Sequence, residues 1–475
     1  MEQANLTAAG VSRPGLKARV LRNVGLVLLA GAALTVIPAG SGSAAPAGEF
    51  TMFVLGPAGY GGNAIASGPD GNMWFTNNAN NSIGRITPSG AVTYFAEPTT
   101  SASASTGGPR LFAIAAGPDG NLWFTSFYAN LVGKITPAGV ITTYPVPTAN
   151  AMPMGITAGL DGNIWFVLDN ASGIGRITPG GVITEFPIPT PGATGPAAIT
   201  SDNGCLMCGF MITAGPLNSL WFTIPAANRV GRITMAGVVT TMPVTTAPPA
   251  STTGTNPSIG AITAGDDGNL WITQNGDGKI ARLTTDGVAT AFALPSATSQ
   301  PSSITPGPDG SLWIGTYAGN ALVQFVVPGA RGTPVIKQFT IPTASSIPTS
   351  VAVGADGSAW FTNVVVTEPI VTQPTALQVG RVGTGVGQIL TVNVTGSAKA
   401  GSALTCSYIN NHGWPPFKTR YQWLRGGKAI ASQTAKKFTP RASDVGSKVS
   451  CRVSVTYAAA LNQLGATSKP VLIKG

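Results

Sequence analysis

The chain has 475 residues, of which 9% are charged and 43% hydrophobic, and its formal net charge is +10. So little charge beside so much apolar content excludes an intrinsically disordered chain and favours dense β structure. The 62 glycines and 38 prolines are typical of many tight turns, and no stretch shows the apolar period of an amphipathic helix.

Residues 1–47 have the order of a secretory signal peptide. Four basic residues come first: Arg13, Lys17, Arg19 and Arg22. An apolar run from Val24 to Ile37 follows, and then small residues, with Ala45-Pro46-Ala47 or Ala44 as the cleavage point. The run is shorter than the about 20 apolar residues of a membrane span, which favours cleavage over an uncleaved anchor. We expect a secreted, extracellular protein that can associate with the cell wall and has no transmembrane span after cleavage.

Residues 48–385 contain a sevenfold repeat, best seen in Asp119-Gly120-Asn121-Leu122-Trp123-Phe124-Thr125. Its tryptophans recur at intervals of 42 to 56 residues: Trp74, Trp123, Trp165, Trp221, Trp271, Trp313 and Trp360. Four short apolar runs per repeat, separated by turn signals, are typical of propeller blades. The sequence therefore predicts an all-β fold with a seven-bladed β-propeller.

The repeated tryptophans and turn aspartates each have two interpretations. Burying a tryptophan removes about 150–250 Å² from water, so each is expected to wedge between neighbouring blades, whereas the alternative is a stacking platform for sugars or bases. The aspartate of Gly68-Pro69-Asp70-Gly71-Asn72 suits a hairpin turn without any cation, although cation binding is the alternative.

The two ends of the repeat region complement each other. The seventh repeat carries an insertion from Val366 to Leu377 and stops at Val379–Val382, without a clear fourth strand. The segment Glu49–Val54 resembles a fourth strand with no blade before it. Pairing the two would close the ring and remove its open sheet edges.

Connections of variable length are expected to lie together at one end of the propeller. They join the second strand to the third, or one blade to the next, and loops on a rigid scaffold commonly bind ligands. The alternative is that these loops are solvated filler. The predicted lining of this ligand-binding face is Asn77, Asn78, Phe127, Tyr128, Asp169, Gln274, Asn275, Tyr317 and Asn363.

The longest loop contains Cys205-Leu206-Met207-Cys208. A C-x-x-C pair can be redox-active or half of a zinc site, but the propeller offers no further Cys or His and no βαβ pattern surrounds the pair. In a secreted chain we predict a local disulfide between Cys205 and Cys208, and no metal site.

Residues 386–475 differ in composition and predict a small immunoglobulin-like β-sandwich. Cys406, Trp423 and Cys451 stand in the order typical of that fold, and we predict a Cys406–Cys451 disulfide. The tyrosine usual two residues before the second cysteine is replaced by Val449. Gly396–Gly475 holds twelve Lys or Arg and one acid, Asp444, so its net charge is 12 − 1 = +11.

That charge predicts attachment to polyanions. The basic patch consists of Lys418, Arg420, Arg425, Lys428, Lys436 and Lys437. Its expected partners are anionic cell-wall polymer, a surface glycan or phospholipid headgroups; a secreted protein is not expected to bind nucleic acid. The alternative is that the lysines only solvate the sandwich.

The repeat Ile-Thr-Ala-Gly-x-x-Asp-Gly-Asn-Leu-Trp-Phe-Thr, followed by Ile-Gly-Arg-Ile-Thr-Pro-x-Gly, resembles the virginiamycin B lyase (streptogramin lyase) family over nearly all of 49–382. The tail, with Tyr421-Gln422-Trp423-Leu424-Arg425, resembles immunoglobulin-like modules of bacterial surface proteins. The first resemblance implies a seven-bladed propeller that opens a cyclic depsipeptide by Mg²⁺-assisted elimination, with His and Glu side chains near the central channel.

The implied catalytic residues are not found at the matching positions. After the Trp-Phe-Thr strands stand Asn77, Ser126, Ile224, Gln274 and Asn363, and before the first strands Met154, Ser302 and Thr349. The one histidine, His412, is in the tail, and Glu49, Glu97, Glu185 and Glu368 fall on strands or outer loops without a visible partner. We therefore predict no catalytic residues, no cofactor, and a secreted or cell-surface binding or scaffold protein. The alternatives are a lyase with Mg²⁺ and a glycan-binding propeller that uses Phe127, Tyr128 and Tyr317.

Overall fold

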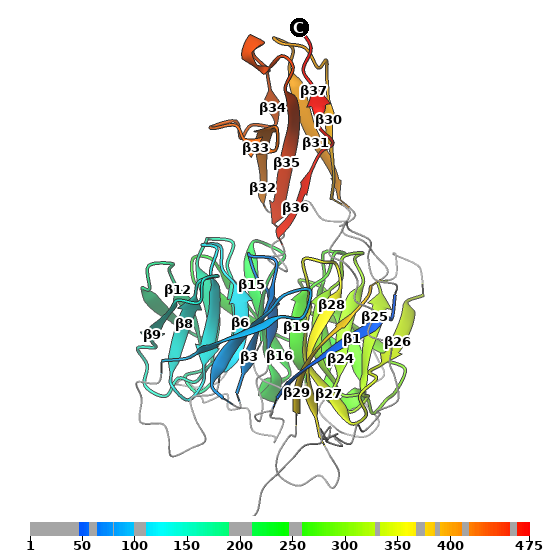
Figure 1. Cartoon of the computed structure of the whole chain (residues 1–475). Helices are drawn as coiled ribbons and strands as arrows, with labels where there is room; N and C mark the ends of the chain where they lie inside the picture. Colours follow the sequence, from blue (N-terminus) through cyan, green and yellow to red (C-terminus); the bar gives the residue numbers. More distant parts are fainter. Residues whose placement is uncertain are drawn as a thin grey trace, which may run out of the picture. The chain divides into compact units, whose positions relative to one another are not determined.

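The computed structural model of the chain describes eleven segments: 47–56, 64–78, 80–98, 111–189, 211–246, 259–327, 333–366, 376–384, 390–410, 418–456 and 463–475. These segments contain β-strands and three short 3₁₀ turns, Pro225–Ala227, Asn275–Asp277 and Ala442–Asp444, but no α-helix (Figure 1). No helix capable of crossing a membrane is found in them. The predicted signal peptide lies outside the described residues.

Residues 50–382 form seven antiparallel sheets of four strands, one of which gains a fifth strand. The first sheet contains β2 (Ile65–Ser67), β3 (Met73–Asn77), β4 (Ser82–Ile86) and β5 (Val92–Ala96). The second contains β6 (Leu111–Ala116), β7 (Leu122–Ser126), β8 (Leu131–Ile135) and β9 (Ile141–Pro145). The third contains β10 (Pro153–Ala158), β11 (Ile164–Leu168), β12 (Gly173–Ile177) and β13 (Ile183–Pro187). The fourth contains β14 (Ile212–Gly215), β15 (Ser219–Ile224), β16 (Arg229–Thr234) and β17 (Val239–Pro243).

The remaining three sheets repeat this order. The fifth contains β19 (Ile259–Ala264), β20 (Leu270–Gln274), β21 (Lys279–Leu283) and β22 (Val288–Ala293), with β18 (Thr245–Thr246) added in parallel to β22. The sixth contains β23 (Pro301–Pro306), β24 (Leu312–Thr316), β25 (Ala321–Val326) and β26 (Val335–Thr340). The seventh contains β27 (Ser346–Val353), β28 (Ala359–Val365), β29 (Ala376–Val382) and β1 (Phe50–Gly56). The parallel strand β18 is not predicted by the sequence pattern.

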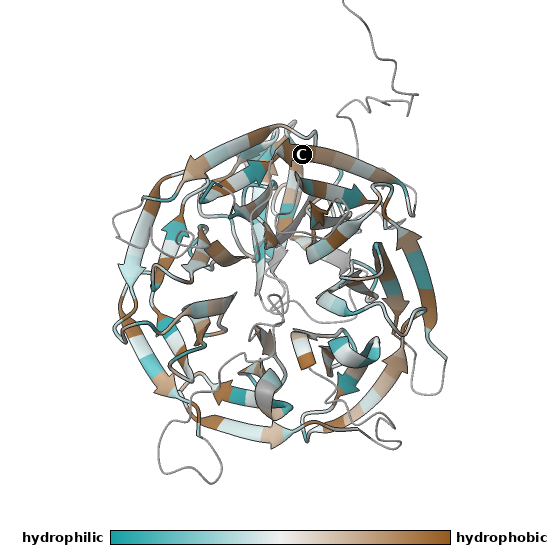
Figure 2. Cartoon of the chain, turned by 90° about the horizontal axis from the view of Figure 1, so that it is seen from below, coloured by the Kyte–Doolittle hydropathy of each residue, from teal (hydrophilic) through white to brown (hydrophobic). Residues whose placement is uncertain are grey.

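The seven sheets form a closed ring of propeller blades. Their innermost strands contact one another in the order β2, β6, β10, β14, β19, β23, β27 and back to β2. Figure 2 shows these blades around a central axis. Strand β1 pairs antiparallel with β29, from Phe50 opposite Val382 to Gly56 opposite Leu377. The N-terminal segment thus supplies the missing fourth strand of the last blade, as expected from the sequence.

Each repeated tryptophan is fully buried between two blades. Trp74 shares an apolar cluster with Phe124 of the next blade, and Trp123 shares one with Phe166. At the remaining junctions the equivalent partners in the next blade are Phe222, Ile272, Ile314, Phe361 and, for Trp360 of the seventh blade, Phe75 of the first. The wedge interpretation is confirmed, and the tryptophans are not available as a stacking platform.

The turn aspartates hold the tryptophans in place. Asp119 Oδ1 accepts hydrogen bonds from the Asn121 backbone (3.2 Å) and from the Trp123 indole (3.1 Å). The neighbouring Gly120 has a φ of 79°, which glycine adopts at little cost. In the fourth blade Leu217 and Asn218 replace Asp-Gly, and Trp221 donates instead to the Pro216 carbonyl (3.0 Å). The aspartates therefore act in turn chemistry.

The third strands carry an interaction that the sequence analysis missed. The Arg85 guanidinium lies 5.6 Å from the Trp74 ring centroid, and its Nη1 donates to the Pro137 carbonyl in the next blade (2.9 Å). Lys134 and Arg176 repeat both contacts, reaching Pro179 and Met235. The Gly-Arg of the repeat thus fastens one blade to the next.

Residues 390–472 form two further sheets. One contains β30 (Leu390–Thr395), β31 (Leu404–Asn410) and β34 (Lys437–Phe438). The other contains β33 (Lys428–Ala429), β32 (Lys418–Arg425), β35 (Lys448–Thr456) and β36 (Gln463–Thr467), with β37 (Val471–Leu472) paired to β35. Side chains of both sheets meet in one buried cluster.

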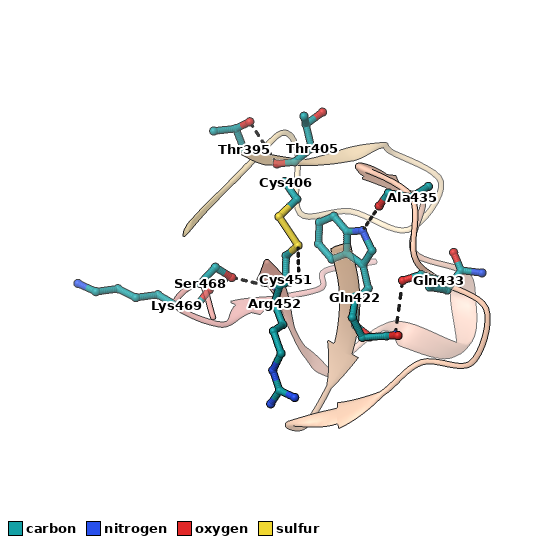
Figure 3. The surroundings of a disulfide bond; sticks show 11 residues. Thr395, Thr405, Cys406, Gln422, Gln433, Ala435, Cys451, Arg452, Ser468 and Lys469 are labelled. Carbon is teal, nitrogen blue, oxygen red and sulfur yellow. Dashed lines mark hydrogen bonds between the residues drawn. A yellow bond between two sulfur atoms is a disulfide. The ribbon is translucent and has the colours of Figure 1, made fainter. Parts of the chain in front are cut away.

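A disulfide joins these two sheets, as predicted. Cys406 of β31 is bonded to Cys451 of β35, with an S–S distance of 2.16 Å (Figure 3). Beside it Trp423 stacks on Phe438, with 5.2 Å between the ring centroids, and donates to the Ala435 carbonyl. The immunoglobulin-like assignment and the domain boundaries at 48–385 and 386–475 stay predictions, and the Cys205–Cys208 pair lies outside the described residues.

Candidate functional site

The predicted ligand-binding face lies where the second strands end. We use the term loop face for the end of the ring where the second strands end and the first strands begin. The third residue after each tryptophan occupies the same position there in every blade: Asn77, Ser126, Leu168, Ile224, Gln274, Thr316 and Asn363. All seven side chains are buried, and none is an acid or a base.

Gln274 has the least satisfied polar side chain of these seven. It is 1% exposed, and neither its amide nitrogen nor its amide oxygen has a hydrogen-bond partner among the described residues. The equivalent Asn363 instead donates to Ser346 Oγ (2.9 Å) and Gln378 Oε1 (3.0 Å). An unsatisfied buried amide costs about 1–3 kcal/mol, so an external hydrogen-bonding group near Gln274 would be stabilising.

The remaining polar residues of the predicted lining are only partly available. Asp169 is buried, and its backbone N–H donates to the Met152 carbonyl (3.2 Å). Asn78 and Asn275 are half-buried and take part in interactions within the chain. Together with Asn363 these residues have their main contacts inside the propeller.

The three predicted aromatic platforms differ in exposure. Phe127 is half-buried and packs against the apolar cluster between the third and fourth blades. Tyr128 meets Phe127 edge-on, with 4.9 Å between the ring centroids. Tyr317 is 40% exposed and is the clearest surface for a ligand's apolar face.

Glu97 is a buried acid that the sequence analysis placed among strands and outer loops. It follows β5 and is 5% exposed at the junction of the first and second blades. Burial raises the pKa of the Glu97 carboxyl group, and hydrogen bonding from Asn81 and Ser126 lowers it by less. Neither carboxyl oxygen forms an ordinary hydrogen bond with a described residue, so these two neighbours are weak partners. The burial of Glu97 could have been predicted from the next two blades, because the equivalent position there holds an aliphatic residue between two prolines, in Pro-Val146-Pro and Pro-Ile188-Pro.

The described residues do not fit the metal chemistry implied by the resemblance. They contain no group of three or more His, Cys, Asp or Glu side chains that could hold a metal ion. Mg²⁺ needs oxygen ligands in near-octahedral geometry, usually from one or two carboxylates. His412 and Glu368 lie outside the described residues.

The predicted basic patch contains one compensated charge. Arg425 forms an ion pair with Asp444, whose side chain is 1% exposed, and Asp444 Oδ2 also accepts from the Arg441 backbone (2.7 Å). The other patch residues in the described part are exposed: Arg420, Lys428, Lys436 and Lys437. The Lys418 side chain lies outside the description. Arg425 therefore adds little to the field of the patch.

Comparisons with known proteins agree with the fold. The model of the virginiamycin B lyase family matches residues 40–208 and 249–375. A streptogramin B lyase structure is 28% identical, covers 70% of this chain and 98% of its own, and has a TM-score of 0.56. Selenomethionine-substituted virginiamycin B lyase from Staphylococcus aureus is also 28% identical over 70% of this chain and 99% of its own, with a TM-score of 0.55.

A third solved structure bears on catalysis. It is a catalytically inactive histidine-to-alanine variant of the Staphylococcus aureus enzyme with quinupristin, 28% identical over 70% of this chain and 100% of its own, with a TM-score of 0.56. The comparison with curated protein sequences gave no match.

Proposed function

Because the chain belongs to the virginiamycin B lyase family, we propose that it keeps the family's ligand-binding propeller without its lyase chemistry. In this proposal the protein is secreted or held at the cell surface and binds a neutral, polar ligand at the loop face. The observation that carries the proposal is the set of neutral side chains at the seven equivalent positions, with the unsatisfied amide of Gln274 among them.

The chemistry of elimination supports the non-catalytic part. A base must take a proton, and a second group must stabilise the developing negative charge. The relative described above loses activity when one histidine becomes alanine. The propeller of this chain has no histidine at all, since the single histidine is His412.

The alternative is a lyase of the streptogramin B type. Among the described residues, Glu97 has the environment closest to that of a base, because burial raises the pKa of its carboxyl group. Its weak partners Asn81 and Ser126 are neutral, so they would not stabilise a negative charge as a cation does. The lyase alternative therefore has less support.

Binding of a glycan is the form of the proposal that suits the exposed ring of Tyr317 and the unsatisfied amide of Gln274, which a ligand reaches only if this buried side chain is uncovered. Sugar hydroxyl groups can both donate to and accept from an amide such as Gln274, and Tyr317 offers an exposed ring. A glycan array probed with the mature protein, followed by titration calorimetry of any hit, tests this.

The decisive comparison in that titration is between two equivalent positions. Gln274→Ala should weaken binding at least tenfold, because it removes an amide that has no partner in the described chain. Thr316→Val is the matched control, since the Thr316 hydroxyl already donates to the Ala321 carbonyl (2.8 Å). Equal affinity of both variants and the natural protein would rule out Gln274 as a contact.

The second part of the proposal is that the basic C-terminal region attaches the protein to anionic polymers. The region has twelve basic residues, and its one acid is already paired with Arg425. Such attraction weakens with salt, because the Debye length falls from about 10 Å at 0.1 M to about 3 Å at 1 M.

Sedimentation with cell-wall preparations tests the attachment. The full chain should bind at 0.1 M salt and be released at 1 M salt, and a variant with Arg420, Lys436 and Lys437 changed to Gln should bind less. Retention at 1 M salt, or unchanged binding of the variant, would refute an electrostatic attachment.

A further inference from the structure

One position recurs at the junctions between blades, directly after each fourth strand. At six junctions its backbone N–H donates to the carbonyl of the residue just before the third strand of the same blade, at 2.9 to 3.1 Å. At five junctions this position holds a buried aliphatic residue: Val146, Ile188, Val244, Leu294 or Ile341. At the junction of the first and second blades it holds Glu97, which donates to the Asn81 carbonyl (3.1 Å) and is equally buried.

The aliphatic residues contribute to the packing between blades. Val146 lies in one apolar cluster with Leu168 of the next blade, and Ile188 lies in one with Ile224. The corresponding neighbours at the first junction are Glu97 and Ser126, and the apolar cluster there contains neither. At the other three junctions an aliphatic residue, Val244, Leu294 or Ile341, corresponds to Gln274, Thr316 or Asn363. The first junction is therefore the one of the six at which both positions are polar and one of them is an acid.

No charged side chain in the described part compensates Glu97. Arg85 of β4 and Lys134 of β8 reach the carbonyls of Pro137 and Pro179, in turns at the opposite end of the ring. On β5, Tyr94 packs against Phe75 at the other face of the blade. After β7, Tyr128 packs against Phe127. What faces the carboxyl group is the neutral pair Asn81 and Ser126.

A carboxylate without a charged partner is costly to bury, whereas a neutral carboxyl group is tolerated. We propose that Glu97 is a proton-binding switch. The junction between the first two blades is closed while the Glu97 carboxyl group is neutral, and ionisation of that group loosens the junction. The loosening would extend to Asn78 and Asn81 at the loop face, because Glu97 is bonded to the Asn81 carbonyl. This inference is independent of the function proposed above.

The sign of the effect follows from the two states of the chain. The pKa of the Glu97 carboxyl group has its ordinary value, about 4.5, in the unfolded chain, and burial raises it in the folded chain. The folded state therefore holds the proton more tightly over the interval between them. Stability from this group is fully present below the unfolded pKa and is lost as the pH rises through the folded pKa.

Thermal denaturation of the full chain between pH 4 and pH 8 tests the switch. The variants are Glu97→Gln, which keeps the shape without the titration, and Glu97→Ile, which copies Ile188 and Ile341. The midpoint of the natural protein should fall relative to both variants as the pH rises, by about 2–4 °C or more. Val146→Glu places the same acid at the next junction and should introduce a similar fall.

Hydrogen exchange localises the effect. Between low and high pH, after correction for intrinsic exchange, the natural protein should lose protection around Asn81, Glu97 and Ser126, and Glu97→Gln should not. Identical pH dependence of the midpoint in the natural protein and Glu97→Gln would overturn the proposal. So would a midpoint of the natural protein that rises with pH relative to Glu97→Ile.

Discussion

The propeller and the C-terminal sheets are held together in different ways. The propeller repeats one small set of contacts seven times: a buried tryptophan, a turn and, at most junctions, a cation that reaches the next blade. The C-terminal sheets have a single buried cluster around Trp423 and one disulfide between them. Stabilisation is therefore distributed in the first region and concentrated in the second.

This difference has a consequence for substitution. A repeated design can replace one contact at one junction, as with Glu97 or with Leu217 and Asn218, because the other junctions and the pairing of β1 with β29 keep the ring closed. The C-terminal sheets share one buried cluster and one disulfide, so no equivalent contact replaces either of them when it is lost. Four changes test the contrast, in decreasing order of expected effect.

Trp123→Ala should have the largest effect. It removes a fully buried indole between the second and third blades and should cost about 3–5 kcal/mol. Calorimetry should show a lower propeller transition with the C-terminal transition unchanged. A loss below about 1 kcal/mol would contradict the wedge role.

Loss of the disulfide should destabilise only the C-terminal sheets. Cys406 and Cys451 are 45 residues apart, and the chain-entropy model assigns such a link roughly 4 kcal/mol. The double change Cys406→Ala and Cys451→Ala should lower the C-terminal transition and leave the propeller transition in place. A lower propeller transition would show that the two regions are coupled.

Contacts that repeat along the chain could be predicted from the sequence, whereas most single contacts could not. The blades, the buried tryptophans and the pairing of β1 with the seventh blade could be predicted, because the same pattern occurs seven times. The Cys406–Cys451 pair was predictable from residue order. Single, non-repeated contacts were not: the Arg425–Asp444 ion pair joins residues whose proximity depends on how β32 and the 3₁₀ turn Ala442–Asp444 fold together.

The candidate site was predictable in position but not in detail. Strand direction places Asn77, Gln274 and Asn363 at one end of the ring. Whether an amide is satisfied depends on side chains from other strands, such as Ser346 and Gln378 beside Asn363. The repeat position shared with Val146 and Ile188 could have indicated that Glu97 is buried, whereas the neutral character of its neighbours depends on the adjoining blade.

Asp119→Ala should have an intermediate effect. It removes the acceptor for the Trp123 indole and for the Asn121 side chain, so it should cost about 1–2 kcal/mol. The matched control is Asp309→Ala, because no indole bond joins Asp309 to Trp313 in the described structure. If added cations stabilised the natural protein but not Asp119→Ala, the turn interpretation would fail.

Arg85→Ala should have the smallest effect. It removes a cation over the Trp74 ring and one hydrogen bond to the Pro137 carbonyl, together about 1 kcal/mol. Arg85→Lys should restore part of the loss, since Lys134 makes the same two contacts in the second blade. An equal loss in both variants would mean that guanidinium geometry, rather than charge, matters there.

The central claim, a family propeller that binds without opening a ring, is tested most directly by incubating the mature full chain with a streptogramin B and Mg²⁺. Elimination within a ring leaves the molecular mass unchanged, so liquid chromatography with tandem mass spectrometry is needed to separate the cyclic compound from its linear isomer. A streptogramin B lyase serves as the positive control. We predict that the cyclic compound is recovered intact after complete conversion in the control. Linear product at a rate comparable to that of the control would contradict the account.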